Sequence, residues 1–154
     1  MIRVCKIIIN TILVIMIVVL SIYAILRFTN RVDIYKVQTG SMEDGIHVGD
    51  YIFIIRQNDY KVDDVVTYKK DNYHVTHRII KENGDKVITK GDANNTEDKE
   101  ISKSDIIGKV IYKGGLLNFV INFKFAIVSL LLGLYLLTYY FDKNGNKKEL
   151  KNEK

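Results

Sequence analysis

The chain has 154 residues, of which 47% are hydrophobic, and it carries a formal net charge of +5. This charge comes from the two ends, because residues 28–118 hold 14 Lys and Arg against 15 Asp and Glu. A basic face for nucleic acid is therefore not expected. The single cysteine, Cys5, excludes an intramolecular disulfide, so the fold depends on core packing alone.

The first apolar segment, Ile7–Leu26, contains 20 residues without a charge. A helix of ~20 apolar residues is long enough to cross a hydrocarbon core of ~30 Å. Bulky residues and Arg27 follow it, where a removable signal sequence would have a small-x-small cleavage site. We therefore expect an N-terminal membrane anchor over residues 1–27. Basic residues flank it on both sides, so this segment alone does not set its orientation.

The part between residues 28 and 118 contains short runs of alternating apolar residues, separated by clusters of Gly, Asn and Asp. Such runs at intervals of about ten residues predict an all-β domain. Asn83-Gly84-Asp85 is typical of the turn between two paired strands. The predicted strands are Asp50–Arg56, Val65–Lys69, Tyr73–Lys81, Lys86–Thr89 and Ile106–Tyr112.

A second apolar segment, Phe125–Phe141, follows the predicted domain, which Gly114-Gly115 would end. Its 17 residues are at the short end of the spanning range, and we predict a second membrane segment over 119–141, with Leu116–Phe123 as a membrane-surface approach. The sequence leaves open whether this segment spans fully or lies in the interface. The fold class is thus mainly β, a small ectodomain with N-terminal and C-terminal transmembrane helices.

The tail over residues 142–154 carries five lysines. Lysine-rich ends favour the cytoplasmic side of a membrane. With two spans, both termini would be cytoplasmic and the domain over 28–118 would be extracytoplasmic in a multi-pass protein of the cell membrane.

Ser41 lies in a turn-rich stretch, Thr39–Asp50, that leads into a predicted strand. A serine hydroxyl is a weak nucleophile, so a catalytic role needs a base and a group that orients the base. His77 is a candidate base, and Asp92 and Asp98 are candidate orienting residues, all of them downstream of Ser41.

Strand alternation separates the histidines. His77 shares a face with Val75 and Ile79, and burial on an apolar face favours the neutral form that a base must have. His74 would face the opposite way, so the two histidines do not indicate a metal site, and no cofactor is indicated. His47 is the other candidate base, since it follows Ser41 closely in sequence.

Each of these residues also has a structural interpretation. From its position alone, each is better explained without catalysis: His77 as a hydrogen-bonded core histidine, Asp92 as a turn residue that caps backbone amides, and Asp98 as a solvated residue in a polar loop. Taken separately, none of them indicates catalysis.

Four motifs in order, TGSMEDGIHVGDYIFI, VTHRII, TKGDANNTED and DIIGKV, resemble type I signal peptidases. The resemblance is to the endoplasmic-reticulum/archaeal-like branch, in which histidine stands where most bacterial members have a lysine base. It covers about Val37–Gly115 together with the first anchor. One departure is Asp44, which stands where the family usually has proline after Met-Glu.

The resemblance implies a membrane-bound serine endopeptidase that removes signal peptides from secretory preproteins. Ser41 would be the nucleophile, His77 the general base, Asp98 the residue that orients it, and Asp92 a structural or second acidic partner. The implied partners are the preproteins, the lipid bilayer and the secretion translocon, with no nucleic acid. Small residues before the cleaved bond would be selected by shallow pockets, for which we expect Ile52, Ile54 and Val75 as lining residues.

Two other functions fit parts of the sequence. A non-catalytic, membrane-anchored β module that assists export or assembly would keep the fold without needing Ser41. A self-cleaving serine hydrolase of the same fold, as in self-cleaving repressors, would use lysine and be soluble, which the two apolar segments argue against.

Overall fold

The computed structural model describes residues 2–152, with the side chains of residues 4, 6–141 and 143. The chain divides into two units, a β domain over Ile25–Phe119 and a second unit formed by the helical residues on either side of it. Each unit is described by itself.

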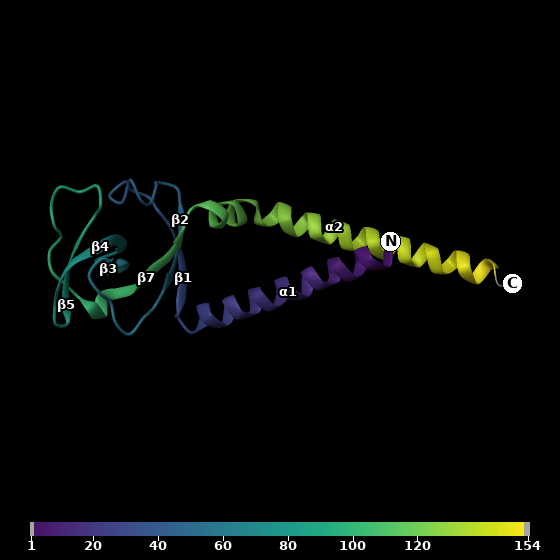
Figure 1. The fold of residues 1–154 in the computed structure, drawn as a ribbon, viewed down its shortest axis with the longest axis horizontal. Coiled ribbons are helices and arrows are strands. Elements are labelled where there is room, and N and C mark those ends of the chain that lie inside the picture. The colour runs from purple at the N-terminus through teal and green to yellow at the C-terminus, as the bar shows by residue number, and fades with distance from the viewer. Residues whose placement is uncertain (1, 153–154) are drawn as a thin grey trace. The chain divides into compact units, whose positions relative to one another are not determined.

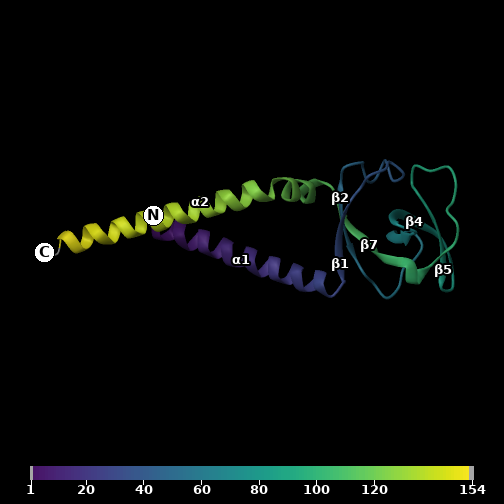
Figure 2. The same cartoon turned by 180° about the vertical axis from the view of Figure 1, so that it is seen from behind.

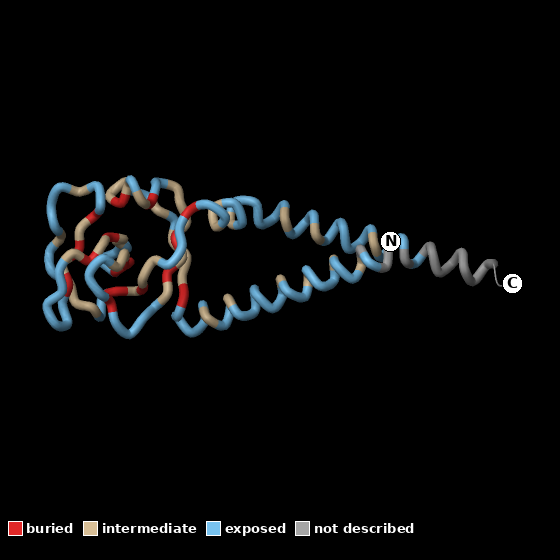
Figure 3. The backbone as a smooth tube through the Cα atoms, viewed as in Figure 1, coloured by how far each residue is buried: buried red, intermediate tan, exposed pale blue. Residues whose placement is uncertain are grey.

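Two long helices carry the apolar segments (Figure 1). Helix α1 spans Ile2–Phe28 and helix α2 spans Gly115–Asn152. The portions Lys6–Phe28 and Gly115–Phe141 are long and apolar enough to cross a membrane, with mean hydropathies of 2.7 and 2.1. Most residues of these two portions are exposed, and Figure 3 colours them pale blue.

Both helices differ in extent from the sequence-based expectation. Leu116–Phe123, predicted as a separate membrane-surface approach, is a continuous part of α2. No proline or glycine interrupts residues 116–124, so nothing ends the helix there. Apart from Lys143, the side chains of the lysine-rich tail predicted over 142–154 lie outside the described residues.

The domain between the helices is a seven-stranded antiparallel sheet in the order β1-β2-β7-β3-β4-β5-β6. Figure 2 shows β1, β2 and β7 beside one another from behind. The strands are β1 (Val32–Lys36), β2 (Tyr51–Ile55), β3 (Val65–Lys70), β4 (Tyr73–Asn83), β5 (Lys86–Lys90), β6 (Ile101–Ser102) and β7 (Ile106–Lys113).

The prediction of an all-β domain is confirmed, and all five predicted strands are present. Gly84, with a φ of 57°, lies in the predicted turn between β4 and β5. Strands β1 and β6 were not predicted. Charges interrupt the short run of β1, and β6 has only two residues, so neither leaves a clear alternating pattern.

The buried side chains form two clusters. One contains Tyr60, Val66, Tyr68, Ile79, Val87 and Ile106. The other contains Met42, Ile46, Ile52 and Ile54. The second cluster joins strand β2 to the loop that carries Ser41, so core packing fixes the position of this loop.

Candidate active site

The loop after Gly40 is anchored by apolar side chains. Met42 and Ile46 are 2% and 3% exposed, and the Ile46 amide donates to the Met42 carbonyl at 2.8 Å, as in one helical turn. Burying two such side chains contributes about 1.5–3 kcal/mol each. This packing leaves Ser41, which precedes Met42, partly exposed at the edge of a cleft.

Asp44 has a backbone conformation that proline cannot adopt. Its φ is 75°, whereas the proline ring fixes φ near −65°. Aspartate is one of the few residues other than glycine that tolerate this left-handed region. The departure from Met-Glu-Pro therefore coincides with a different local backbone in this loop.

A second loop, Gly91–Ala93, lies directly against Ser41. The Ala93 amide donates to the Ser41 carbonyl at 3.0 Å, and the Asp92 amide donates to Met42 Sδ at 3.4 Å. A Cβ atom on Gly91 would lie 2.5 Å from the Ser41 carbonyl oxygen. The close approach of the two loops therefore requires glycine at position 91.

Gly91→Ala is expected to destabilise the domain by about 1–3 kcal/mol, because the new methyl group displaces the Ser41 backbone. Thermal unfolding in detergent micelles measures the effect. Gly45→Ala is the matched control, since a Cβ there meets only ordinary contacts of 3.5 Å or more. Equal stability of the two variants would contradict the proposed packing of residue 91 against Ser41.

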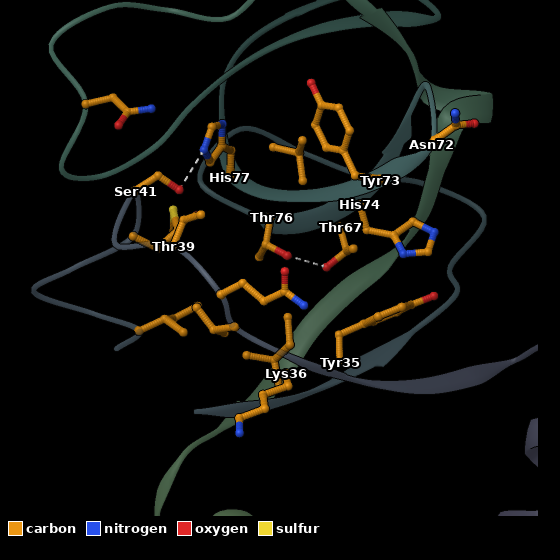
Figure 4. Close-up of a pocket in the computed structure, with 17 residues that line it drawn as sticks. Tyr35, Lys36, Thr39, Ser41, Thr67, Asn72, Tyr73, His74, Thr76 and His77 are labelled. Atoms are coloured by element: carbon orange, nitrogen blue, oxygen red, sulfur yellow. Dashed lines mark hydrogen bonds between the residues drawn. The ribbon is translucent and has the colours of Figure 1, made fainter. Parts of the chain in front are cut away.

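His77 lies in the middle of β4 and is 6% exposed. Its Nε2 atom is 3.0 Å from Ser41 Oγ, and its Nδ1 atom is 2.5 Å from Asp98 Oδ2. Figure 4 shows the Ser41 and His77 side chains pointing toward each other at one side of the cleft, joined by the dashed line. The structure thus brings together three side chains from a loop, a strand and a second loop.

Three donors surround one oxygen of Asp98. Besides His77, the buried Thr89 hydroxyl donates to Asp98 Oδ2 at 2.8 Å and the Tyr68 hydroxyl donates at 3.4 Å. Burial opposes ionisation of this carboxyl, but the bonds from His77 and Thr89 outweigh it and keep the Asp98 pKa below its usual value. Burial also raises the pKa of Tyr68 to about 12, so its phenol remains a neutral donor.

The ionised Asp98 determines the tautomer of His77. A carboxylate only accepts hydrogen bonds, so Nδ1 must carry the proton that is donated to it. In the neutral imidazole, Nε2 is then left with a lone pair directed at the Ser41 hydroxyl. This is the arrangement in which histidine removes a proton from a serine nucleophile.

Asp92, the other acidic candidate, contacts Arg78 instead of His77. Arg78 Nε and Nη2 donate to the two Asp92 oxygens at 2.9 and 2.7 Å, and Nη1 donates to the Asp63 carbonyl at 2.9 Å. The bond to Asp92 raises the pKa of Arg78. Because Arg78 follows His77 on β4, this ion pair connects the histidine strand to the Gly91–Ala93 loop, which packs against Ser41.

Asp92→Asn is expected to lower the free energy of unfolding by about 1 kcal/mol, a modest effect because the ion pair is partly exposed. Turnover should fall far less than on loss of Asp98, since Asp92 does not contact the imidazole. Unfolding measured at low and high salt checks this, because the difference between the variants should shrink as salt increases. A loss of turnover as large as that of an Asp98 variant would contradict this assignment.

The other two histidines contact other side chains. His47 Nδ1 is 2.7 Å from Glu43 Oε2, and this hydrogen bond raises the pKa of the exposed imidazole. The His74 ring contacts the Tyr35 ring edge-on, with centroids 4.8 Å apart. Within the described part of the chain, no group of three or more His, Cys, Asp or Glu side chains could hold a metal ion.

A cleft of about 680 Å³ runs past Ser41 and His77. Tyr35 and His74 lie at the side opposite Ser41, as Figure 4 shows. Val75 and Ile52 line the cleft as expected, although Ile52 is only 1% exposed, whereas Ile54 belongs to the same core cluster as Ile52 and does not line the cleft. Thr67 and Thr76 also line the cleft, with their hydroxyl oxygens 2.9 Å apart.

Sequence reasoning missed Thr89 and Tyr68 as partners of Asp98. A usable signal exists for Thr89, since it alternates with buried Val87 on β5 and is therefore a polar residue on the core side of the sheet. A polar group placed there needs a hydrogen-bond partner. Tyr68 gives no such signal, because tyrosine is common in strands.

The sequence profile of the family described as Peptidase S24-like matches residues 21–111, more than half of the chain. The matched region includes Ser41, His77, Asp92 and Asp98. No curated protein gives a significant match.

Proposed function

The chain belongs to the Peptidase S24-like family, and from this premise we propose that it is a membrane-bound signal peptidase I. Its substrates are secretory preproteins, from which it removes the N-terminal signal peptide. The observation that carries the proposal is the Ser41–His77–Asp98 chain of contacts at 3.0 and 2.5 Å, which opens on a cleft in a domain bounded by two apolar helices.

The proposed reaction is acyl transfer. Ser41 Oγ attacks the scissile carbonyl carbon while His77 Nε2 takes the hydroxyl proton. Asp98 holds the imidazole in the required tautomer and stabilises its charged form. As the C–N bond breaks, His77 returns the proton to the leaving amine. Water, activated by the same imidazole, then releases the acyl group from Ser41.

The site also needs donors for the oxyanion of the tetrahedral intermediate. The backbone N–H of Ser41, with a neighbouring group from the Gly40 or Thr39 side of the turn, is our assignment for this role.

The cleft suits an extended peptide. Strand β1 is at one end of the sheet, so one of its edges has no neighbouring strand. Among the described strands, β5 pairs with β4 only from Arg78 to Asn83, so one edge of Tyr73–His77 is also without a neighbouring strand. Both open edges belong to residues that line the cleft. A peptide added as a strand there gains main-chain hydrogen bonds that do not depend on its sequence. The pockets beside Ser41 would then determine which peptide sequences are cleaved.

Short connections join the domain to both helices. Only Thr29–Arg31 separates α1 from β1, and only Gly114 separates β7 from α2. If both helices span the bilayer, Ser41 stays near its surface, where the cleavage site of an inserted signal sequence emerges. The lysine-rich tail favours the cytoplasmic side, which supports our proposal that the termini are cytoplasmic and the domain is extracytoplasmic. In this position it would receive preproteins from the secretion translocon.

A matched pair of substrates tests this proposal. The protein, reconstituted in lipid vesicles, is incubated with a preprotein and with the same preprotein lacking the apolar core of its signal sequence. We expect cleavage of the first only, at one site after a small residue, as identified by sequencing the new amino terminus. Equal cleavage of both would support a general serine peptidase and reject the signal-peptidase assignment.

A further inference from the structure

The first turn of α2 is hydrogen-bonded to the end of the loop that carries Ser41. The Asn118 side-chain amide donates to Asp50 Oδ1 at 2.7 Å, and its carbonyl oxygen accepts from the Tyr51 amide at 2.7 Å. One side chain on α2 thus binds both the last residue of the loop and the first residue of β2. Both bonds lie within the β-domain unit, which extends to Phe119.

Asp50 is in turn hydrogen-bonded to His47 within the loop. Its second oxygen accepts from the His47 amide at 3.0 Å, and its own amide donates to the His47 carbonyl at 3.0 Å. The bond from Asn118 keeps the pKa of Asp50 below its usual value, so the carboxylate remains a full acceptor. A Cβ on Gly114 would lie 3.1 Å from both carboxylate oxygens, so the absence of a side chain at this position leaves room for Asp50 beside the start of α2.

The remaining contacts run from His47 to the turn at Ser41. Glu43 is 2.7 Å from His47 Nδ1 through one oxygen and accepts from the Val48 amide at 3.3 Å through the other. The Glu43 amide donates to the Gly40 carbonyl at 3.0 Å, across Ser41. Lys113, two residues before α2, also donates to the Gly45 carbonyl.

We propose that the first turn of α2 holds the nucleophile loop in place, with Asn118 as a positioning residue that acts on Ser41 through Asp50, His47 and Glu43. The proposal rests on the proposed role of Ser41 as the nucleophile. It gives the second apolar helix a part in the reaction besides anchoring. The helix must begin at Gly115 for Asn118 to reach Asp50, so a correctly formed α2 becomes a condition for an aligned Ser41.

Asn118→Leu removes both hydrogen bonds while keeping the side-chain volume similar. We expect kcat to fall about 10- to 100-fold with little change in KM, because a small displacement of a reacting group is costly whereas the cleft itself is untouched. Asn122→Leu, an exposed position one turn further along α2, is the matched control and should leave kcat unchanged.

Amide hydrogen exchange gives a readout that does not depend on the substrate. In Asn118→Leu, the amides of His47, Val48 and Tyr51 should exchange faster than in the wild-type protein, while those of β4 and β5 should not change. Unchanged exchange in the loop would overturn the proposal whatever the activity.

Exchanging the two residues provides a rescue. Asp50→Asn combined with Asn118→Asp restores an amide–carboxylate pair and the acceptors for the His47 and Tyr51 amides. Asn118→Asp alone instead places two carboxylates side by side. We expect the double variant to recover most of the kcat that the single variant loses, and no recovery would contradict a specific positioning contact.

The two proposals fail in different ways. If Ser41→Ala abolishes cleavage but Asn118→Leu leaves kcat unchanged, the positioning role is wrong and the peptidase function stands. If Ser41→Ala leaves cleavage intact, the proposed function is wrong, and the exchange measurement still decides whether α2 holds the loop.

Discussion

Ser41→Ala is expected to abolish cleavage of preproteins, with turnover lower by ~10⁴–10⁶-fold. The hydroxyl oxygen 3.0 Å from His77 Nε2 is the proposed nucleophile, and alanine keeps the backbone while removing that oxygen. Because the buried neighbours Met42 and Ile46 are unaffected, the domain should remain folded. The measurement is single-turnover cleavage in vesicles, with thermal unfolding as the check on folding.

Ser104→Ala is the matched control, since this serine is exposed on the short 3-10 helix Lys103–Asp105 and bonds only locally to Ser102 in the contacts described. It should cleave at the wild-type rate. Full cleavage by both variants would show that Ser41 is not the nucleophile, whereas absence of cleavage by the wild-type protein itself would favour a non-catalytic β module, in which Ser41 is only a turn residue. Loss of activity in Ser41→Ala through unfolding would show instead that its hydroxyl is needed for folding.

Local patterns predicted most of the fold. Alternation located β2–β5 and β7, the uncharged apolar runs located the two helices, and the placement of His77 beside Ile79 assigned its ring to the apolar side. These features depend on near neighbours in sequence, so they can be recognised without knowing how the strands pair. Helix α2, which begins at Gly115, is longer than the predicted membrane segment, because apolar runs indicate the hydrophobic part of a helix better than they indicate its ends.

The choice between Asp92 and Asp98 could not be made in this way. It depends on β4 pairing with β5, after which the Asp98 amide donates to the Thr89 carbonyl at 2.8 Å and its carboxylate reaches His77. The contact between Asn118 and Asp50 is even less predictable from the sequence, since 68 positions separate the two residues in the chain. Such contacts are properties of the folded sheet and leave no local signal.

Asp98→Asn is expected to lower kcat by ~10³–10⁴-fold with the fold intact. An asparagine amide can donate to His77 Nδ1, which would place the imidazole proton on Nε2. That nitrogen could then no longer accept the proton of Ser41. Loss of the negative charge also leaves the charged imidazole of the transition state without its partner. The measurement is kcat as a function of pH, with Asp85→Asn in an exposed turn as the control.

The same variant has a predictable effect on acid stability. The folded-state pKa of Asp98 lies below that of the unfolded chain, so its ionised form stabilises the fold above an ordinary aspartate pKa of about 4. This contribution is lost as the pH falls through the lower, folded-state value. Asp98→Asn should therefore be less stable than wild type at neutral pH, and the difference should shrink below about pH 4. A stability difference that stayed constant well below that pH would mean that the carboxylate does not accept these hydrogen bonds, and the assigned tautomer of His77 would lose its basis.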